Sequence, residues 1–259
     1  MKAFTPNLKP NYTEYMVIIG INVLLGLFLW ANSPIVSIPS FTKVLNAYPL
    51  LLKEDALIVE LISSVKLYLH VIGITCVVSA LIAYLSVIPF FKPFAGLVCK
   101  LRAMSPIGLV MVFTILASNG YWLKVYIMSF CVVPWLVTSM CGIINTIKQE
   151  DFEYAETLRF GHWKTTWHVV IRGQLHQVIE AFRQVAMMGI VMLPVAEKLS
   201  KADGGLGFLL SGLERFQTFD KIWAIQIMII CLAIVQDIVI RQIRDQFCPY
   251  ATMMEEGKK

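Results

Sequence analysis

Histidine, acidic and aromatic side chains gather in one polar run of this 259-residue chain, residues 151–172, which reads DFEYAETLRFGHWKTTWHVVIR. His162 and His168, with His176 just beyond, are six and eight residues apart. Histidine pairs that bind metal on a helix are four residues apart, so this spacing predicts no metal site. Aromatic groups beside charges of both signs are instead typical of a surface that binds a partner protein.

Other chemistry-bearing patterns are missing from the sequence. The six cysteines contain no CxxC pair, so neither a zinc site nor a disulfide framework is predicted. No GxxxxGK[ST] phosphate-binding loop occurs. The glycine cluster 204–207 follows no predicted strand, which excludes a nucleotide site there. We predict no catalytic residues and no cofactor bound by this chain.

Composition places the polar run in a membrane protein. The chain is 58% hydrophobic and only 15% charged, with a mean hydropathy of +0.70, whereas soluble domains carry about 25% charged residues. The apolar runs are continuous and close to the roughly 20 residues that cross a bilayer. We therefore predict an all-α membrane protein, a single transmembrane domain over residues 1–259 with about six transmembrane helices. They are 15–33, 61–88, 93–117, 121–146, 178–199 and 221–242.

The positions of lysine and arginine predict orientation. With the N-terminus inside, the inner segments hold about twice as many of these residues as the outer ones, which favours two cytoplasmic termini. The net charge of +5 then reflects topology and gives no support for nucleic-acid binding. Ala31-Asn32-Ser33 weakly resembles a signal-peptide cleavage site, but the apolar stretch before it is longer than usual, so an uncleaved first span is favoured.

A short amphipathic helix is predicted on the outer side after the first span. Ser40 is its expected N-cap, and Phe41, Val44, Leu45 and Tyr48 share one face. We expect this helix to lie in the membrane interface and to cap the bundle by packing.

The polar run itself is predicted to begin with a helix. Glu150, Asp151, Glu153 and Glu156 crowd the start of that helix, where negative charge complements the helix dipole. Two interpretations remain open from composition alone. One is a protein-binding surface, and the other is an amphipathic helix resting on lipid headgroups with Trp163 and Trp167 as anchors.

The run resembles the EAA loop of binding-protein-dependent ABC importer permeases, in the nitrate/sulfonate/taurine-type branch. Glu153 matches the family acid and Ala155 its second alanine. The family glycine and proline positions are occupied by Arg159 and Arg172, and Gly161 and Gly173 are the residues expected to supply the chain reversals instead. A further match covers the W…W-x-V-V-L stretch, at Trp163, Trp167, Val169, Val170 and Ile171.

Three other segments resemble the same branch in the same order. They are IPSFTKVLNAYPLL, LRAMSPIGLVMVF and VAEKLSKADGGLGFLL, the last matching a V-A-E…G-L-G pattern at Glu197, Gly205, Leu206 and Gly207. Together the matches cover most of residues 38–245.

This resemblance implies a type I ABC importer (MetI-like) permease fold and a subunit that forms the path for a small solute, such as nitrate or a sulfonate. It implies a bacterial plasma (inner) membrane location, a homodimer of this chain, two ABC ATPase subunits that use ATP and Mg, and a solute-binding protein on the outer face. Residues 148–175 become the cytoplasmic coupling loop. The implied ATPase-coupling residues are Glu153, Ala155, Glu156, Arg159, Phe160, Gly161, Trp163 and Lys164.

Polar residues within the predicted spans mark a candidate translocation pathway, because ionisable groups at membrane depth are functional candidates. Pro106 and Met192 are added as residues that could shape such a path where helices bend, with ordinary packing in the bundle as their favoured alternative. The set is Arg102, Ser105, Pro106, Met192 and Glu197. Arg102 is expected either to attract an anion or to extend to the headgroups. Glu197 is expected either to serve an outer gate or binding-protein contact, or to be a solvated helix-end residue.

Close charge pairs within the last two spans are expected to be structural. Glu180 and Arg183 are three residues apart, and Asp237 and Arg241 are four apart.

Two other classes of protein remain as alternatives. A polytopic membrane enzyme would need a convergent catalytic cluster, for which only Asp151, Glu153 and His162 are candidates. An energy-coupling-factor-type transmembrane subunit would need paired Ala-Arg-rich coupling helices, and none is evident in the sequence. Dependence of transport on a soluble binding protein would separate that class from the importer.

Overall fold

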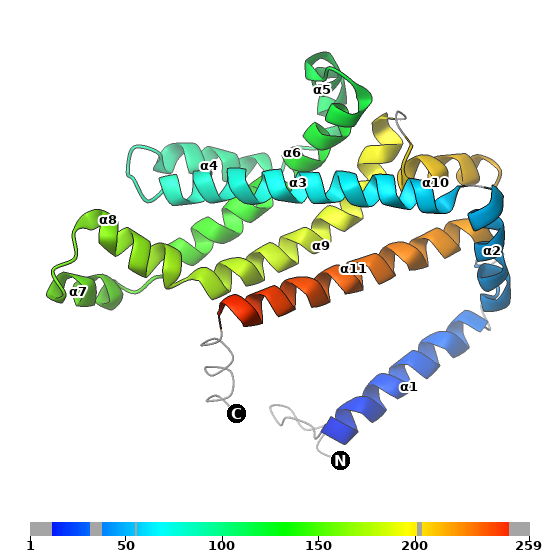
Figure 1. The fold of residues 1–259 in the computed structure, drawn as a ribbon, viewed down its shortest axis with the longest axis horizontal. Helices are drawn as coiled ribbons and strands as arrows, with labels where there is room; N and C mark the ends of the chain where they lie inside the picture. The colour runs from blue at the N-terminus through cyan, green and yellow to red at the C-terminus, as the bar shows by residue number, and fades with distance from the viewer. Residues whose placement is uncertain (1–11, 32–37, 55, 201–203, 249–259) are drawn as a thin grey trace.

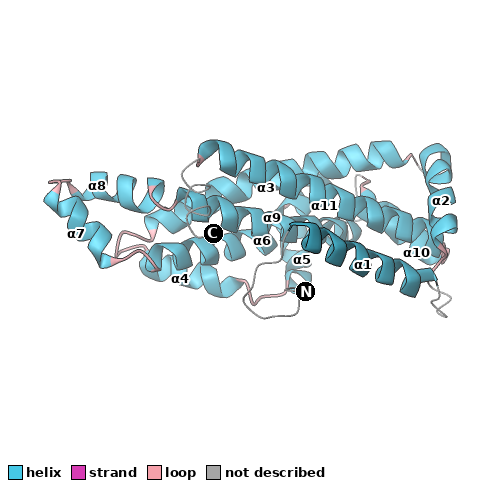
Figure 2. Ribbon diagram, turned by 90° about the horizontal axis from the view of Figure 1, so that it is seen from below, coloured by secondary structure: helices cyan, strands magenta, loops and turns pink. Residues whose placement is uncertain are grey.

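A computed structural model describes residues 12–31, 38–54, 56–200 and 204–248, and within these ranges all the regular structure is helical (Figures 1 and 2). The helices are α1 (Tyr12–Ala31), α2 (Phe41–Glu54), α3 (Leu57–Leu85), α4 (Lys92–Leu101), η2 (Pro106–Leu109), α5 (Val110–Leu116), α6 (Gly120–Asn145), α7 (Gln149–Thr157), α8 (His162–Thr165), η3 (Thr166–Arg172), α9 (Leu175–Ser200), α10 (Leu206–Arg215) and α11 (Phe219–Phe247).

Four helices, α3, α6, α9 and α11, are long and apolar enough to cross a membrane. They lie at the second, fourth, fifth and sixth predicted spans, and so confirm those four. At the first predicted span lies α1, whose apolar stretch Met16–Trp30 is shorter than the other four. Residues 32 and 33, the predicted end of this span, fall outside the described ranges.

The third predicted span, 93–117, is wrong as a single straight helix. The chain there forms α4 and then η2 with α5, and the two parts are bent by 102°. The cause is local, because proline disfavours helical geometry in the residue before it and has no N–H to continue a helix. Ser105, before Pro106, accordingly has an extended backbone with φ −73° and ψ 128°.

The centre of the bundle is built from α3, α6 and α9, which pack closely on one another. Small and polar residues of α3 line this contact and are fully buried: Ser64, Thr75, Ser79 and Ala83. Gly189 of α9 lies against Tyr68, Ile72 and Val132. Small residues let helix backbones approach closely within a membrane, where packing rather than the hydrophobic effect drives helix association.

The short helix α2 caps one end of the bundle, as predicted, by packing on α11. Its buried residues are Val44, Ala47 and Leu51, while Phe41 and Leu45 of the predicted stripe are about half exposed. The Tyr48 hydroxyl donates to the carbonyl oxygen of Ala224 at 2.9 Å, and burial raises the pKa of this phenol. The predicted stripe is therefore correct at Val44 and Tyr48, and the buried face is completed by Ala47 and Leu51 in place of Phe41 and Leu45.

The two regions of functional interest lie at opposite ends of the long helices (Figure 1). One end carries α7 and α8, and the C-terminal end of α11 points the same way. The other end carries α2 and α10 (Figure 2). Any communication between these ends must therefore run along the long helices themselves.

Candidate functional site

The polar loop, residues 148–175, is a helix–turn–helix unit at one end of the bundle. The acid-rich segment forms α7 as predicted, and α7 ends at a tight turn. Arg159 has a left-handed backbone with φ 54°. The N–H of Phe160 donates to the carbonyl of Ala155 at 3.1 Å, and that of Arg159 to the carbonyl of Glu156 at 2.8 Å. This pair of bonds is the Schellman motif that closes many helices, with Arg159 where glycine is preferred.

The backbone angles in this turn show which residue reverses the chain. Gly161 has φ −71°, which any residue adopts, so the prediction that Gly161 reverses the chain is wrong. Arg159, at the position matched to the family glycine, takes the left-handed conformation that glycine adopts at least cost. Arg159, and not Gly161, is therefore the residue that reverses the chain after α7.

Gly173 has a different role from the predicted reversal. Its backbone is right-handed, and its N–H donates to the carbonyl of His168 at 3.0 Å, five residues back. A Cβ at this position would lie 2.5 Å from the carbonyl oxygen of Val169. Glycine here permits the close backbone approach that the π-helical segment η3 requires.

A groove of about 400 Å³ separates the polar loop from the turn between α3 and α4. Glu156, Phe160 and Trp163 line it on the loop side, and Trp163 is 78% exposed. Of the other predicted coupling residues, Glu153, Arg159, Gly161 and Lys164 are exposed and Ala155 is buried. The Lys164 ammonium lies 4.4 Å from the centre of the Phe160 ring, which holds this cation beside the groove.

We predict that Arg159→Gly stabilises the protein by about 0.5–1 kcal/mol. Glycine removes the strain of the left-handed backbone, which costs ~1–2 kcal/mol for an L-residue. Part of this gain in stability is lost because glycine also increases the conformational entropy of the unfolded chain. The midpoint of thermal unfolding in detergent measures the change. Arg172→Gly is the matched control, because Arg172 lies in the right-handed helical backbone of η3, where glycine should lower the stability of the protein by about 1 kcal/mol. Equal loss of stability in both variants would contradict the strained turn.

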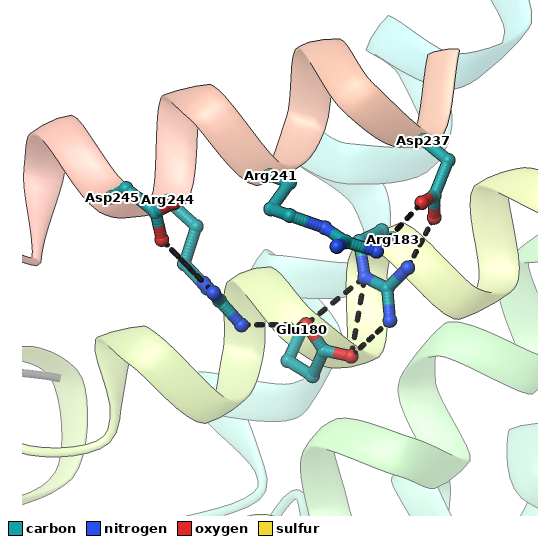
Figure 3. A network of polar contacts seen from close by, with 6 residues as sticks. All are labelled: Glu180, Arg183, Asp237, Arg241, Arg244 and Asp245. Atoms are coloured by element: carbon teal, nitrogen blue, oxygen red, sulfur yellow. Dashed lines mark hydrogen bonds and ion pairs between the residues drawn. The ribbon is translucent and has the colours of Figure 1, made fainter. Parts of the chain in front are cut away.

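Six charged side chains join α9 to α11 toward the polar-loop end (Figure 3). They are Glu180, Arg183, Asp237, Arg241, Arg244 and Asp245. Arg183 donates to both oxygens of Glu180, at 2.5–3.1 Å, and pairs with Asp237. Asp237 also pairs with Arg241 at 3.0 Å, and Glu180 with Arg244 at 3.3 Å. Both predicted pairs are confirmed, and the structure shows that they form one network.

We predict that Arg183→Met destabilises the protein by about 2 kcal/mol. The substitution leaves the carboxylates of Glu180 and Asp237, only 30% and 20% exposed, without their shared cation. Arg241→Met is the control, because this side chain is 55% exposed and exposed pairs contribute at most about 1 kcal/mol. Thermal unfolding of both variants measures the difference, and equal losses would contradict the central position of Arg183.

Three of the five predicted pathway residues come together. Arg102, Pro106 and Met192 line a small cavity of about 90 Å³ between α4, α6 and α9. The Arg102 guanidinium lies 5.5 Å from the centre of the Trp135 ring, a cation–π distance. Ser105 is exposed at the bend. Both roles expected for Arg102 stay predictions.

Glu197 lies apart from this cavity, at the α10 end. It is 1% exposed, so the alternative of a solvated helix-end residue is wrong. Its carboxylate accepts from the Ser64 hydroxyl at 2.6 Å and from the N–H of Gly207 at 2.8 Å. Ser64 in turn accepts from the N–H of Leu206 at 2.8 Å. These bonds satisfy two free N–H groups of the first turn of α10 and place negative charge at its dipole.

Two further charged residues complete this arrangement, which we name the Glu197 network. Lys124 of α6, 2% exposed, donates to the carbonyl of Gly204 at 2.7 Å, and Glu60 of α3 accepts from the N–H of Gly205. Sequence reasoning missed Ser64, Lys124 and Glu60, because only the folded bundle brings α3, α6 and α9 to one point. The feature of the sequence that could have indicated this network is Lys124, a lysine inside the otherwise apolar predicted span 121–146.

No protein-family model and no curated protein sequence matches the chain. Among solved structures, the chain is similar to one in a crystal structure of an amino acid ABC transporter with histidines. The TM-score is 0.58 at 16% sequence identity, over 81% of this chain and 97% of that one. The similarity shows that the chain shares the fold of that transporter chain, and the predicted all-α membrane-protein fold is confirmed.

Proposed function

We propose that this chain is the transmembrane subunit of an ATP-driven ABC importer and couples to separate ATPase subunits through the polar loop. One observation carries the proposal: the exposed Trp163 lines a groove together with Glu156, next to a turn in which Arg159 has a left-handed backbone. Aromatic anchors in a recess, flanked by charge, are typical of surfaces that bind a protein. The fold shared with a chain of an ABC transporter supports the same function.

In this proposal the chain itself makes and breaks no covalent bonds, and two ATPase subunits bind ATP and Mg. Closure of the ATPases would pull on the polar loop, which leads directly into α9. Because ion pairs among Glu180, Arg183, Asp237 and Arg244 tie α9 to α11, these two helices would move together. The Glu197 network at the far end of α9 would carry the motion to α3 and α10.

The remaining partners follow from the exposed surfaces. A second copy of the chain suits the apolar face of α5, where Met111 and Ile115 are almost four-fifths exposed. A solute-binding protein on the outer side suits the groove of about 570 Å³ along α10, lined in part by Lys198, Glu214 and Phe216. The chain would lie in a bacterial inner membrane with both termini in the cytoplasm. Arg102 favours a small anionic solute, such as nitrate or a sulfonate.

The test is capture of an ATPase by the tagged chain from native membranes in mild detergent. Trp163→Ala and Glu156→Gln should each lower the captured ATPase, with Trp163→Ala reducing it at least about thirtyfold, the effect of a 2 kcal/mol interface anchor. Glu150→Gln, an exposed acid in the first turn of α7, is the matched control and should capture as the native chain does. The mass of the complex also reports whether two copies of the chain are present.

Absence of an ATPase from every sample, with the chain folded and abundant, would overturn the proposal and favour the membrane-enzyme alternative. Among the described residues no group of three or more His, Cys, Asp or Glu side chains is placed to hold a metal ion. Transport that needs no soluble binding protein would favour the energy-coupling-factor class.

A further inference from the structure

A second groove, of about 360 Å³, adjoins the first and shares Ile88, Trp163 and Thr166 with it. On one side it is lined by the last turns of α3 and by Ile88 in the turn that follows, and on the other by α8 and η3. The lining residues are Ala80, Leu81, Tyr84, Leu85, Ile88, Trp163, Thr166, Trp167 and Ile171. They are almost all apolar and include no acidic or basic side chain, unlike the groove beside Glu156. We name this the Trp167 groove.

The groove wall formed by α8 and η3 is amphipathic. Trp163, Trp167 and Ile171 are spaced four apart, and all three line the groove. Residues four apart on a helix lie on the same side. One residue further along from each is a basic or titratable side chain, giving a second row of Lys164, His168 and Arg172. An apolar row beside a basic row is the pattern of helices that lie on a membrane surface.

The groove continues an exposed apolar surface of α3. The α3 wall belongs to a helix apolar enough to span the membrane, and its side chains Leu81 and Leu85 are 59% and 40% exposed. Trp167 is 58% exposed at the end of this surface, where tryptophan is favoured between hydrocarbon and headgroups. An apolar recess that opens toward the hydrocarbon is filled most favourably by an acyl chain.

The basic side chains beside the groove favour a lipid with an anionic headgroup. Lys164 lies over the Phe160 ring, and the His168 ring is 5.4 Å from the same ring. Arg172 is exposed and follows directly after Ile171, the last residue that lines the groove. A guanidinium at this position is complementary to the phosphate and net negative charge of an anionic headgroup.

We propose that the Trp167 groove binds an anionic phospholipid, whose acyl chain lies between α3 and Trp167 and whose headgroup faces Arg172. The polar loop then has two faces. Trp167 anchors it to the membrane, the groove with Glu156 stays open to the protein partner, and Trp163 lines both grooves. This inference goes beyond the proposed function, because it requires the membrane-spanning fold and no ATPase.

The full chain in lipid nanodiscs provides the test, with phosphatidylglycerol or phosphatidylcholine brominated on the acyl chains as the quencher of tryptophan fluorescence. Subtracting the emission of Trp167→Phe from that of the native chain isolates Trp167. We expect this emission to be quenched by both lipids, with about a fivefold preference for phosphatidylglycerol, as one cation near an anionic surface gives. Arg172→Gln should remove most of this preference.

Arg159→Gln is the matched control, because Arg159 is exposed on the same loop and does not line the groove. It should keep the preference for phosphatidylglycerol. Trp167 emission that neither lipid quenches would overturn the proposal, and so would equal quenching that Arg172→Gln leaves unchanged.

Capture of the ATPase separates this inference from the proposed function. Trp167→Phe should retain the ATPase that Trp163→Ala loses. Lipid quenching without any captured ATPase would leave the lipid site standing and overturn the importer proposal. Loss of the ATPase in Trp167→Ala, with no quenching of Trp167, would assign the groove to the protein partner and overturn the lipid site.

Discussion

Glu197→Ala should destabilise the protein by about 3–5 kcal/mol, the range for breaking a buried charged network. The substitution removes the acceptor of the Ser64 hydroxyl and of the Gly207 N–H, both in a region closed to water. It also removes the negative charge that Lys124, 2% exposed, faces across the network. Thermal unfolding in detergent, followed by fluorescence-detected size exclusion, measures the loss.

The control for this prediction is another glutamate of the same end of the bundle. Glu214 pairs with Lys198 on the surface, and both side chains are about half exposed. Glu214→Gln should therefore change stability by less than about 1 kcal/mol. A Glu197→Ala variant as stable as Glu214→Gln would show that the network contributes nothing to the fold.

Gly205→Ala is the second large effect, with an expected loss of about 3 kcal/mol or more. Gly205 has φ 109° and ψ 164°, a backbone region open almost only to glycine. A Cβ at this position would also overlap the carboxylate of Glu197. Because backbone strain and steric overlap add, the loop should detach from the network rather than adjust within it.

Gly161→Ala is the control for Gly205→Ala. Its φ of −71° suits alanine, and nothing lies within 4 Å of where the Cβ would be. Its unfolding midpoint should be unchanged or slightly raised, since alanine restricts the unfolded chain. A similar loss in both variants would refute a specific need for glycine at position 205. Accessibility of the loop to a soluble protease would show the detachment directly.

The sequence predicted the membrane-spanning elements well wherever a span is continuous. Hydrophobic length identifies α3, α6, α9 and α11, because each must satisfy its backbone hydrogen bonds within itself. The prediction was wrong at 93–117, since hydropathy counts apolar residues and does not register a turn at Ser105-Pro106. The proline was visible, but membrane helices tolerate many prolines, as α6 and α9 do at Pro134 and Pro194.

Sites were predictable to the extent that they are local in sequence. The acid-rich start of α7 and the pairs Glu180–Arg183 and Asp237–Arg241 depend on neighbours three or four residues away. The Glu197 network depends on bonds between residues more than a hundred positions apart, such as Ser64 and Glu197. Which residue reverses the chain after α7 was also not predictable, because the preference for Gly161 over an arginine is only statistical.

The 102° break between α4 and α5 has a consequence for the insulating barrier of the membrane. A helix that stops in the hydrocarbon layer leaves backbone carbonyls that lipid tails cannot solvate. Where the break lies within that layer, water or a second chain must supply partners for these carbonyls. The barrier to ions at that point then depends on the side chains that line the small cavity beside Arg102, among them Phe130, Trp135 and Met192.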